Sequence, residues 1–223
     1  MSDGAGTDTR EAIVKAARDL LVSGGIDALS MRKVAAAVGV SATAIYRHFE
    51  NKEALLSAAV VRGARIFGSY LQGGLNETTP LGRLLRMSQC YFDFAREHRY
   101  DYQVLFMLDC EQIGMHKLDQ RAQAETNATF QMLIDRIVDC QNSGDVLPGD
   151  PANLAIFVWS AFHGLASLRI AGRMDVDELA FAALVEQQIE RTVDVISTPA
   201  GVTCRDHLFS NTKRARALCH PRQ

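Results

Sequence analysis

The sequence of 223 residues lacks the motifs on which common enzyme classes depend. It has no Gly-x-Ser-x-Gly elbow, no phosphate-binding glycine loop and no His-Glu-x-x-His pair. Asp109, Glu111 and His116 lie close in sequence, but they fall in an expected loop, where a charged surface is the default interpretation. We therefore expect that the protein is not an enzyme and needs no cofactor.

Cysteines are few and irregularly spaced. Their odd number, five, suits a reducing cytoplasm and argues against a disulfide framework. Cys204-x-x-His207 and the adjacent Cys219 and His220 supply metal-ligand residue types. Because their spacing fits no established zinc pattern, we expect no metal site.

Targeting segments and long apolar runs are also missing. The first ten residues have no basic region followed by an apolar one, so we do not expect export. The longest uncharged apolar run, residues 154–168, contains Ser160 and His163, and it is too short and too polar to span a bilayer. These absences predict a cytoplasmic protein with no membrane partner.

The net charge is only −2, which argues against indiscriminate binding of nucleic acid, but its distribution is uneven. Residues 28–65 carry six basic side chains and two acidic ones, whereas residues 66–197 carry ten basic and eighteen acidic side chains. A basic segment attached to an acidic body is typical of a protein that presents one end to DNA.

Residues 30–55 have the pattern of two short helices joined by a tight turn and followed by a third helix. Ser30 and Ser41 are suited to cap the first and second helix, because their hydroxyls can accept a first-turn N–H. Gly39 stands where the first helix ends, a position that favours positive φ. The pattern predicts a helix-turn-helix, which places its second helix, here residues 42–49, in a DNA major groove.

The second helix divides into two faces. Ile45 and Phe49 can point inward, which leaves Thr43, Tyr46 and Arg47 outward near the start of the helix. Lys52 falls in the first turn of the following helix, where a cation is unfavourable unless it shares an anion such as phosphate with the helix N-terminus. On these residues alone, a small helical hairpin at the protein surface remains an alternative.

The segment LSMRKVAAAVGVSATAIYRHFENKEALL also resembles the DNA-binding segment of the tetracycline-repressor (TetR) family of bacterial one-component regulators. The matching residues are Gly39-Val40-Ser41, Tyr46-Arg47-His48-Phe49 and Lys52-Glu53-Ala54-Leu55, and the resemblance is specific from Thr9 to about Arg65. Many relatives have a lysine or glycine just after the capping serine, whereas Ala42 and Thr43 favour contacts such as a thymine methyl. Together, the resemblance and the outward positions predict these DNA-binding residues: Ser30, Arg32, Ser41, Ala42, Thr43, Tyr46, Arg47, His48 and Lys52.

The remainder of the chain reads as helices, and no segment shows the alternation of strands. We predict an all-α fold with a helix-turn-helix DNA-binding domain at 1–55, a connecting helix at 52–71, a helical effector-binding and dimerisation domain at 72–197 and a flexible tail at 198–223. Within it, the pairs Asp8-x-x-Glu11 and Asp175-x-x-Glu178 are expected to be capping boxes that begin the first and last helices.

The last two helices, about residues 150–172 and 175–197, carry more apolar surface than one packing stripe needs. The first of them is apolar nearly all round, and the second has a stripe through Leu179, Ala182, Val185, Ile189, Val193 and Ile196. Either the first is the central helix of a monomeric bundle, or both pair with a second copy about a two-fold axis. The resemblance implies the second, since TetR-family relatives dimerise through their last two helices.

Trp159-x-x-x-His163-Gly164 is similar to the Trp-His-Gly signature of one subgroup of TetR-type ligand domains. His163 can be a hydrogen-bonded core residue. Alternatively, it lines a pocket for a small hydrophobic or aromatic effector with Tyr91, Tyr102, Phe106, Phe130, Leu133 and Trp159. We therefore expect a homodimeric, ligand-responsive repressor that binds an inverted repeat in double-stranded DNA. An effector-independent regulator or an activator of the same fold is the alternative.

Overall fold

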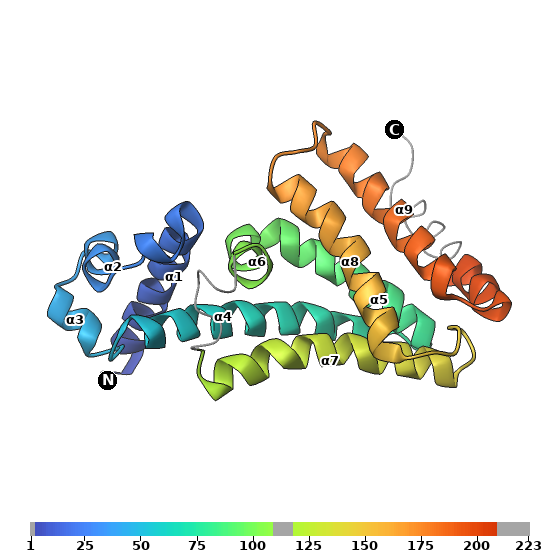
Figure 1. Ribbon diagram of the computed structural model, residues 1–223, viewed down its shortest axis with the longest axis horizontal. Helices are drawn as coiled ribbons and strands as arrows, with labels where there is room; N and C mark the ends of the chain where they lie inside the picture. The colour runs from blue at the N-terminus through green and yellow to red at the C-terminus, as the bar shows by residue number, and fades with distance from the viewer. Residues whose placement is uncertain (1–2, 109–117, 209–223) are drawn as a thin grey trace. The chain divides into compact units, whose positions relative to one another are not determined.

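The computed structural model describes residues 3–108 and 118–208. These residues form helices joined by short turns and contain no strand, only an isolated bridge between Val146 and Ser197. The predicted all-α fold is confirmed (Figure 1). In chain order the elements are α1 (Asp3–Ala28), α2 (Met31–Val38), α3 (Ala42–Tyr46), α4 (Lys52–Gln72), the 3-10 helix η1 (Gly73–Asn76), α5 (Pro80–Glu97), α6 (Arg99–Phe106), α7 (Gln120–Asn142), α8 (Pro151–Ile170) and α9 (Glu178–Ile196).

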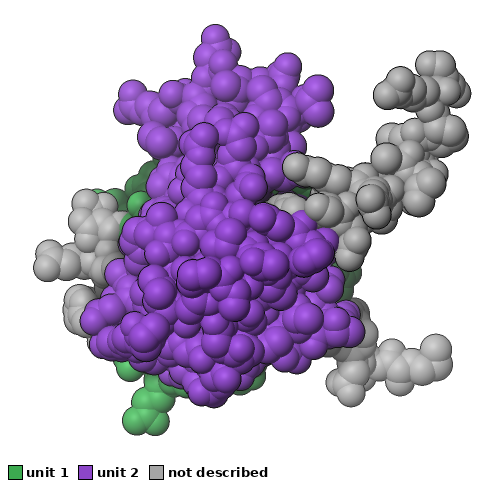
Figure 2. Space-filling model, turned by 90° about the vertical axis from the view of Figure 1, so that its right-hand side faces the viewer, with its two compact units in different colours: residues 1–68, 94–129 green, residues 69–93, 130–223 purple. Residues whose placement is uncertain are grey.

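The chain divides into two compact units, which are coloured separately in Figure 2. The first unit contains residues 1–68 and 94–129, and the second contains residues 69–93 and 130–223. The predicted effector-binding and dimerisation domain, residues 72–197, thus includes parts of both units. α6 and the first part of α7 belong to the same unit as the helix-turn-helix.

The core of the first unit forms around α1, which packs against α2 and α6, while α2 packs against α3. The apolar positions of α1 recur at helical spacing and therefore face one side. The predicted inward residues of the helix-turn-helix, Ile45 and Phe49, are buried. Other buried members of this core are Ile13, Ala17, Leu21, Val34, Leu55 and Val104.

Several helix ends differ from those predicted. α1 begins at Asp3, so Asp8 lies inside the helix instead of capping it. α3 ends at Tyr46, three residues before the expected end. α9 is capped by Asp177, whose side chain accepts a hydrogen bond from the backbone N–H of Ala180 at 2.7 Å, and the predicted cap Asp175 lies outside the helix. At α9, an aspartate two residues along the chain from the predicted one satisfies the first turn.

The predicted tail is wrong for residues 199–208, which are helical. The hydroxyl of Thr198 accepts a hydrogen bond from the backbone N–H of Gly201 at 3.1 Å, as a helix cap does. Arg205 is buried and pairs with Asp194 of α9. A Cβ at position 201 would collide with the backbone of Asp145, so only glycine allows this close approach. The remaining tail residues, including Cys219 and His220, and the expected surface loop with Asp109, Glu111 and His116 lie outside the described residues.

In the second unit, α8 and α9 pack side by side (Figure 1). Most of the α9 stripe expected at a dimer interface is buried within the chain itself, since Val185 and Ile189 are each 4% exposed and Val193 is fully buried. The assignment is therefore wrong for these side chains, whereas Leu179 and Ala182 of the same stripe are exposed. The large apolar side chains left exposed on α8 and α9 are Ile156, Phe157, Leu168, Leu179 and Val195.

α8 extends beyond the uncharged apolar run, residues 154–168, at both ends. By length and composition alone, α4 and α8 could each cross a membrane, a criterion that core helices of soluble proteins also meet. In α8, only 22% of the most apolar 18-residue window is buried. This helix therefore presents much of its apolar surface outside its own unit.

Candidate functional site

The helix-turn-helix is formed by the caps that the sequence predicts. The Ser30 hydroxyl accepts a hydrogen bond from the N–H of Lys33 at 3.2 Å, and the Ser41 hydroxyl accepts one from the N–H of Ala44 at 3.2 Å. Gly39 ends α2 at φ 75° and ψ 30°, where its N–H is donated to the last carbonyls of the helix. This left-handed residue sets the turn that directs α3 away from α2.

The side chains expected to meet DNA are accessible to different degrees. Tyr46 is 56% exposed, which is unusual for a large aromatic residue unless it has a partner. Arg32, Ser41, Thr43 and Arg47 are exposed as well. Half-buried positions are taken by Ser30, Ala42, His48 and Lys52. α3 and the residue after it thus expose a hydroxyl, a phenol and a guanidinium within five residues, 43–47.

Lys52 is more constrained than its sequence position suggests. Its ammonium donates a hydrogen bond to the carbonyl of Ile26 at 2.6 Å, near the end of α1 and just after its kink at Gly24 and Gly25. Asn51 caps the same helix by accepting from the N–H of Ala54 at 2.7 Å. An ammonium has three protons, so this bond anchors the side chain and still leaves two donors for an anion at the start of α4.

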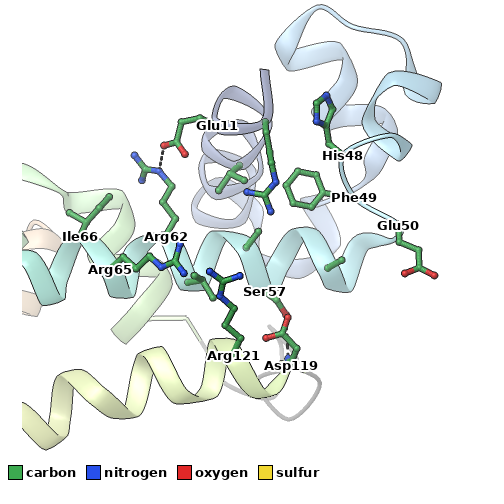
Figure 3. Close-up of a pocket in the computed structure, with 15 residues that line it drawn as sticks. Glu11, His48, Phe49, Glu50, Ser57, Arg62, Arg65, Ile66, Asp119 and Arg121 are labelled. Carbon is green, nitrogen blue, oxygen red and sulfur yellow. Dashed lines mark hydrogen bonds and ion pairs between the residues drawn. The ribbon is translucent and has the colours of Figure 1, made fainter. Parts of the chain in front are cut away.

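A cleft of about 630 Å³ lies in the first unit, between α1, α4 and the start of α7 (Figure 3). Sequence reasoning gave no indication of it, because its lining residues are far apart in the chain. Among them, the Arg10 guanidinium lies 4.7 Å from the ring centre of Phe49, and Arg65 pairs with Glu125 at 2.9 Å. Arg62 points across the cleft to Glu11 in Figure 3.

Arg62 also belongs to an ion-pair cluster around Asp101 of α6. The Asp101 side chain is 2% exposed and pairs with Arg62 at 2.5 Å and with Arg18 at 2.9 Å. Burial alone lowers the pKa of Arg62, but hydrogen bonds and charge from Glu11 and Asp101 outweigh it and raise the pKa. No sequence pattern indicates this cluster, because its members come from three helices.

The aromatic residues expected around an effector fall into both units. Tyr102 is fully buried in the first unit, where its ring contacts Phe106 at 5.1 Å between centroids, and Phe106 contacts Phe67 at 5.4 Å. These residues are part of the core of that unit. The second unit contains the other predicted pocket residues, namely Tyr91, Phe130, Leu133, Trp159 and His163.

Within the second unit, Trp159 links two of these residues. Its ring centre lies 6.0 Å from that of Phe130 and 5.9 Å from that of His163. The Tyr91 hydroxyl lies 3.4 Å from Nδ1 of His163, and burial lowers the pKa of this histidine. A neutral imidazole hydrogen-bonded to a phenol is compatible with a packed core. The same pair could also orient an uncharged ligand.

Gly164, the last residue of the Trp-His-Gly signature, adjoins open space. A Cβ built at this position meets nothing within 4 Å, so no neighbouring group in the chain requires a glycine. Gly164 follows the exposed Phe157 and Ser160 and precedes the exposed Leu168 at spacings of three and four residues. It therefore lies on the outward face of α8.

Metal binding has no support in residues 3–108 and 118–208, where no three His, Cys, Asp or Glu side chains gather in a way that could hold an ion. Cys90 and Cys140 are buried, and burial raises the pKa of Cys140 to about 12. Such thiols are protonated and unreactive at neutral pH.

Two family models match the chain. Residues 13–59 match the bacterial regulatory proteins of the tetR family, and residues 84–192 match the tetracyclin repressor-like C-terminal domain. The class A tetracycline repressor from transposon 1721 of Escherichia coli is 50% identical over 46 residues, which are 21% of each chain. The transcriptional activator FasR of Mycolicibacterium smegmatis is 27% identical over 129 residues, covering 56% of this chain and 59% of FasR. These sequence matches thus span between a fifth and three fifths of those relatives.

Solved structures match over nearly their whole length. A TetR-family protein from Vibrio parahaemolyticus superposes with a TM-score of 0.66 at 24% identity, covering 85% of this chain and 99% of that one. FadR from Bacillus subtilis, solved in complex with stearoyl-CoA, gives a TM-score of 0.68 at 17% identity over 82% and 97% of the two chains. At these identities the likeness shows the fold alone. The two family models and the capped helix-turn-helix together place the chain in the TetR family of transcriptional regulators.

Proposed function

We propose that the protein is a cytoplasmic, ligand-responsive transcriptional repressor that binds an inverted-repeat operator as a homodimer and is released by a small hydrophobic or aromatic effector. The observation that carries this proposal is the outward face of α3, where Thr43, Tyr46 and Arg47 are exposed on a helix capped by Ser41. Such side chains near the start of a second helix are suited to reach base edges in a major groove.

The contacts divide by chemistry. Thr43 and Arg47 read bases, because a methyl contacts thymine and a guanidinium binds guanine in two places. Ser30, Tyr46 and Lys52 hold phosphates, since Ser30 and Lys52 lie at the N-termini of α2 and α4 and Tyr46 is exposed at the end of α3. The bond from Lys52 to Ile26 supports this role by fixing the ammonium near the start of α4.

The dimer forms through the exposed faces of α8 and α9. An apolar helix face with Ile156 and Phe157 exposed at 49% and 42% needs a cover. A second copy is favoured over a lipid bilayer because the same faces also expose Ser160, Gln187 and Arg191. Ser160 and Gly164 are the small residues at the centre of the exposed α8 face, and they allow two helices to approach closely.

The effector site lies in the second unit near Trp159, His163, Tyr91, Phe130 and Leu133. This reduced set omits Tyr102 and Phe106, which pack in the core of the first unit. The ring contacts and the Tyr91–His163 hydrogen bond support an apolar site with one polar group for orientation. The lowered pKa of His163 favours an uncharged ligand.

An activator is the second candidate. Its support is the match to FasR, which is described as an activator and matches more residues of this chain than the tetracycline repressor does. Repressor and activator share the same DNA contacts and differ in where the operator lies relative to the promoter.

Selection of bound fragments from genomic DNA tests the proposal. Wild-type protein should enrich a few fragments that share an inverted repeat, and an Arg47→Ala variant should enrich them weakly or with altered sequence. Fragments near genes would then show whether the operator overlaps the promoter, as repression requires. Compounds related to the products of those genes can be screened for release. Recovery of fragments without any shared sequence would contradict the proposal.

A further inference from the structure

Asp101 joins three helices of the first unit. It belongs to α6, and its carboxylate oxygens accept hydrogen bonds from Nη1 of Arg18 in α1 at 2.9 Å and from Nη1 of Arg62 in α4 at 2.5 Å. Nδ1 of His98 lies 3.8 Å away. Because the carboxylate is 2% exposed, each bond is made out of water, where it is strong.

Both arginines hold a second carboxylate at the surface. Arg18 donates Nε and Nη2 to Asp19, at 2.9 and 2.8 Å, and Arg62 donates Nε to Glu11 at 2.5 Å. The side chains of Asp19 and Glu11 are 55% and 47% exposed. If α6 moved away from α1 and α4, each arginine would keep one acidic partner, and the Asp101 carboxylate would become hydrated.

This arrangement differs from an ordinary buried ion pair. Breaking such a pair by removing one partner leaves a charge buried and uncompensated, at a high cost. Here the paired surface carboxylates remove most of that cost. Opening the cluster around Asp101 therefore costs less than breaking an ordinary buried ion pair.

The two helices that Asp101 joins to α6 flank the DNA-reading helix α3. α1 packs against α2, and the first turn of α4 follows α3 closely and is tied to the end of α1 by the Lys52–Ile26 bond. Glu11 of α1 already holds Arg62 of α4, so Asp101 adds a second, buried tie between α1 and α4 and anchors both to α6.

We propose that Asp101 is a positioning residue for DNA binding: closing its bonds to Arg18 and Arg62 holds the helix-turn-helix in the DNA-binding arrangement, and opening them lowers operator affinity. This inference rests on the proposed function, because it assumes an operator. It assigns Asp101 no contact with DNA.

The test compares operator binding by wild type, Asp101→Asn and a matched control, Glu125→Gln. Glu125 pairs with Arg65 in the same unit at 2.9 Å, but both side chains are partly exposed, at 32% and 49%. Asp101→Asn should raise the operator Kd by about 5- to 150-fold, the usual range for coupling between sites. Glu125→Gln should change it by less than about twofold, because exposed ion pairs contribute little.

Three readouts separate positioning from other roles. The slope of affinity against salt should be the same in Asp101→Asn and wild type, since no phosphate contact is lost. Arg62→Met should weaken binding as well, and its double variant with Asp101→Asn should be no weaker than the single variants, because both open the same cluster. A residue with a purely structural role would lower the melting temperature and leave the affinity of the folded protein unchanged.

If Asp101→Asn does not fold, operator binding is measured on Arg18→Met instead, because Arg18 is less buried than Asp101. A folded Asp101→Asn protein with wild-type Kd would overturn the inference, and so would additive losses or an altered salt slope. If wild-type protein selects no operator, the proposed function fails instead. The two failures are therefore distinguishable.

Discussion

The dimer face gives the most quantitative prediction, because the exposed area of its one phenylalanine can be converted into a contribution to association. Phe157 on α8 is 42% exposed. A phenylalanine buries about 150–250 Å², so roughly 60–100 Å² of each copy remains to be covered. At about 25 cal/mol per Å², two copies contribute roughly 3–5 kcal/mol to association. Phe157→Glu removes this contribution and places a carboxylate in an apolar contact, so the dimer Kd should rise at least about a hundredfold.

Sedimentation velocity over a concentration series measures this change. Leu75→Glu is a matched control, because Leu75 is equally exposed at 42% but belongs to η1, outside the α8 and α9 faces. We expect wild type and Leu75→Glu to sediment as dimers, and Phe157→Glu as a folded monomer near 24.5 kDa. If Phe157→Glu dimerised as tightly as the control, the interface would be elsewhere and the assignment of this face would be wrong.

Four further results follow from the structure. Ile189→Glu should unfold the second unit rather than release a folded monomer, because Ile189 is 4% exposed, and circular dichroism shows which occurs. Arg47→Ala should cost roughly 1–3 kcal/mol of operator binding and relax the preference at particular base pairs, whereas Lys52→Ala should weaken all sequences alike and reduce the salt slope by about one, as binding titrations can resolve. Trp159→Ala should cost clearly less stability than the about 3–5 kcal/mol expected in a tight core, and should alter induction while sparing operator affinity; a full loss of stability in a melting curve would favour the core interpretation. Because the pKa of His163 is lowered from its ordinary 6.5, its contribution to stability is present above that pH and is lost as the pH falls below it, so denaturation of His163→Gln should depend less on pH between about 5 and 7 than that of wild type.

The local structure of the helix-turn-helix could be predicted because short-range chemistry determines it. Ser30, Gly39 and Ser41 each act on backbone groups within four residues, and all three take the predicted roles. The capping pattern did not identify the start of a helix correctly where several polar residues could cap it. Asp177 caps α9 although Asp175 and Glu178 make the better sequence pattern.

Packing between segments that lie far apart in the chain could not be predicted from the sequence. The stripe through Ile189 and Val193 has the spacing of an interface, but the same spacing serves a core, and nothing local distinguishes the two. The cluster at Asp101 joins residues 39 and 83 positions apart, so no motif could reveal it. In the same way, the sequence grouped Tyr102 with Trp159 because both are aromatic, while the fold assigns them to different units.

The central claim is that one dimer reads an inverted repeat through its two α3 helices. It is tested most directly by comparing binding to the selected operator with binding to the same DNA in which one half-site is scrambled. We predict that two chains bind the intact repeat in one cooperative step, with half-sites centred about 34 Å apart or a multiple of it, and that the scrambled DNA binds at least about a hundredfold more weakly. Equal affinity for both DNAs, or binding of a single chain to the intact repeat, would contradict the account.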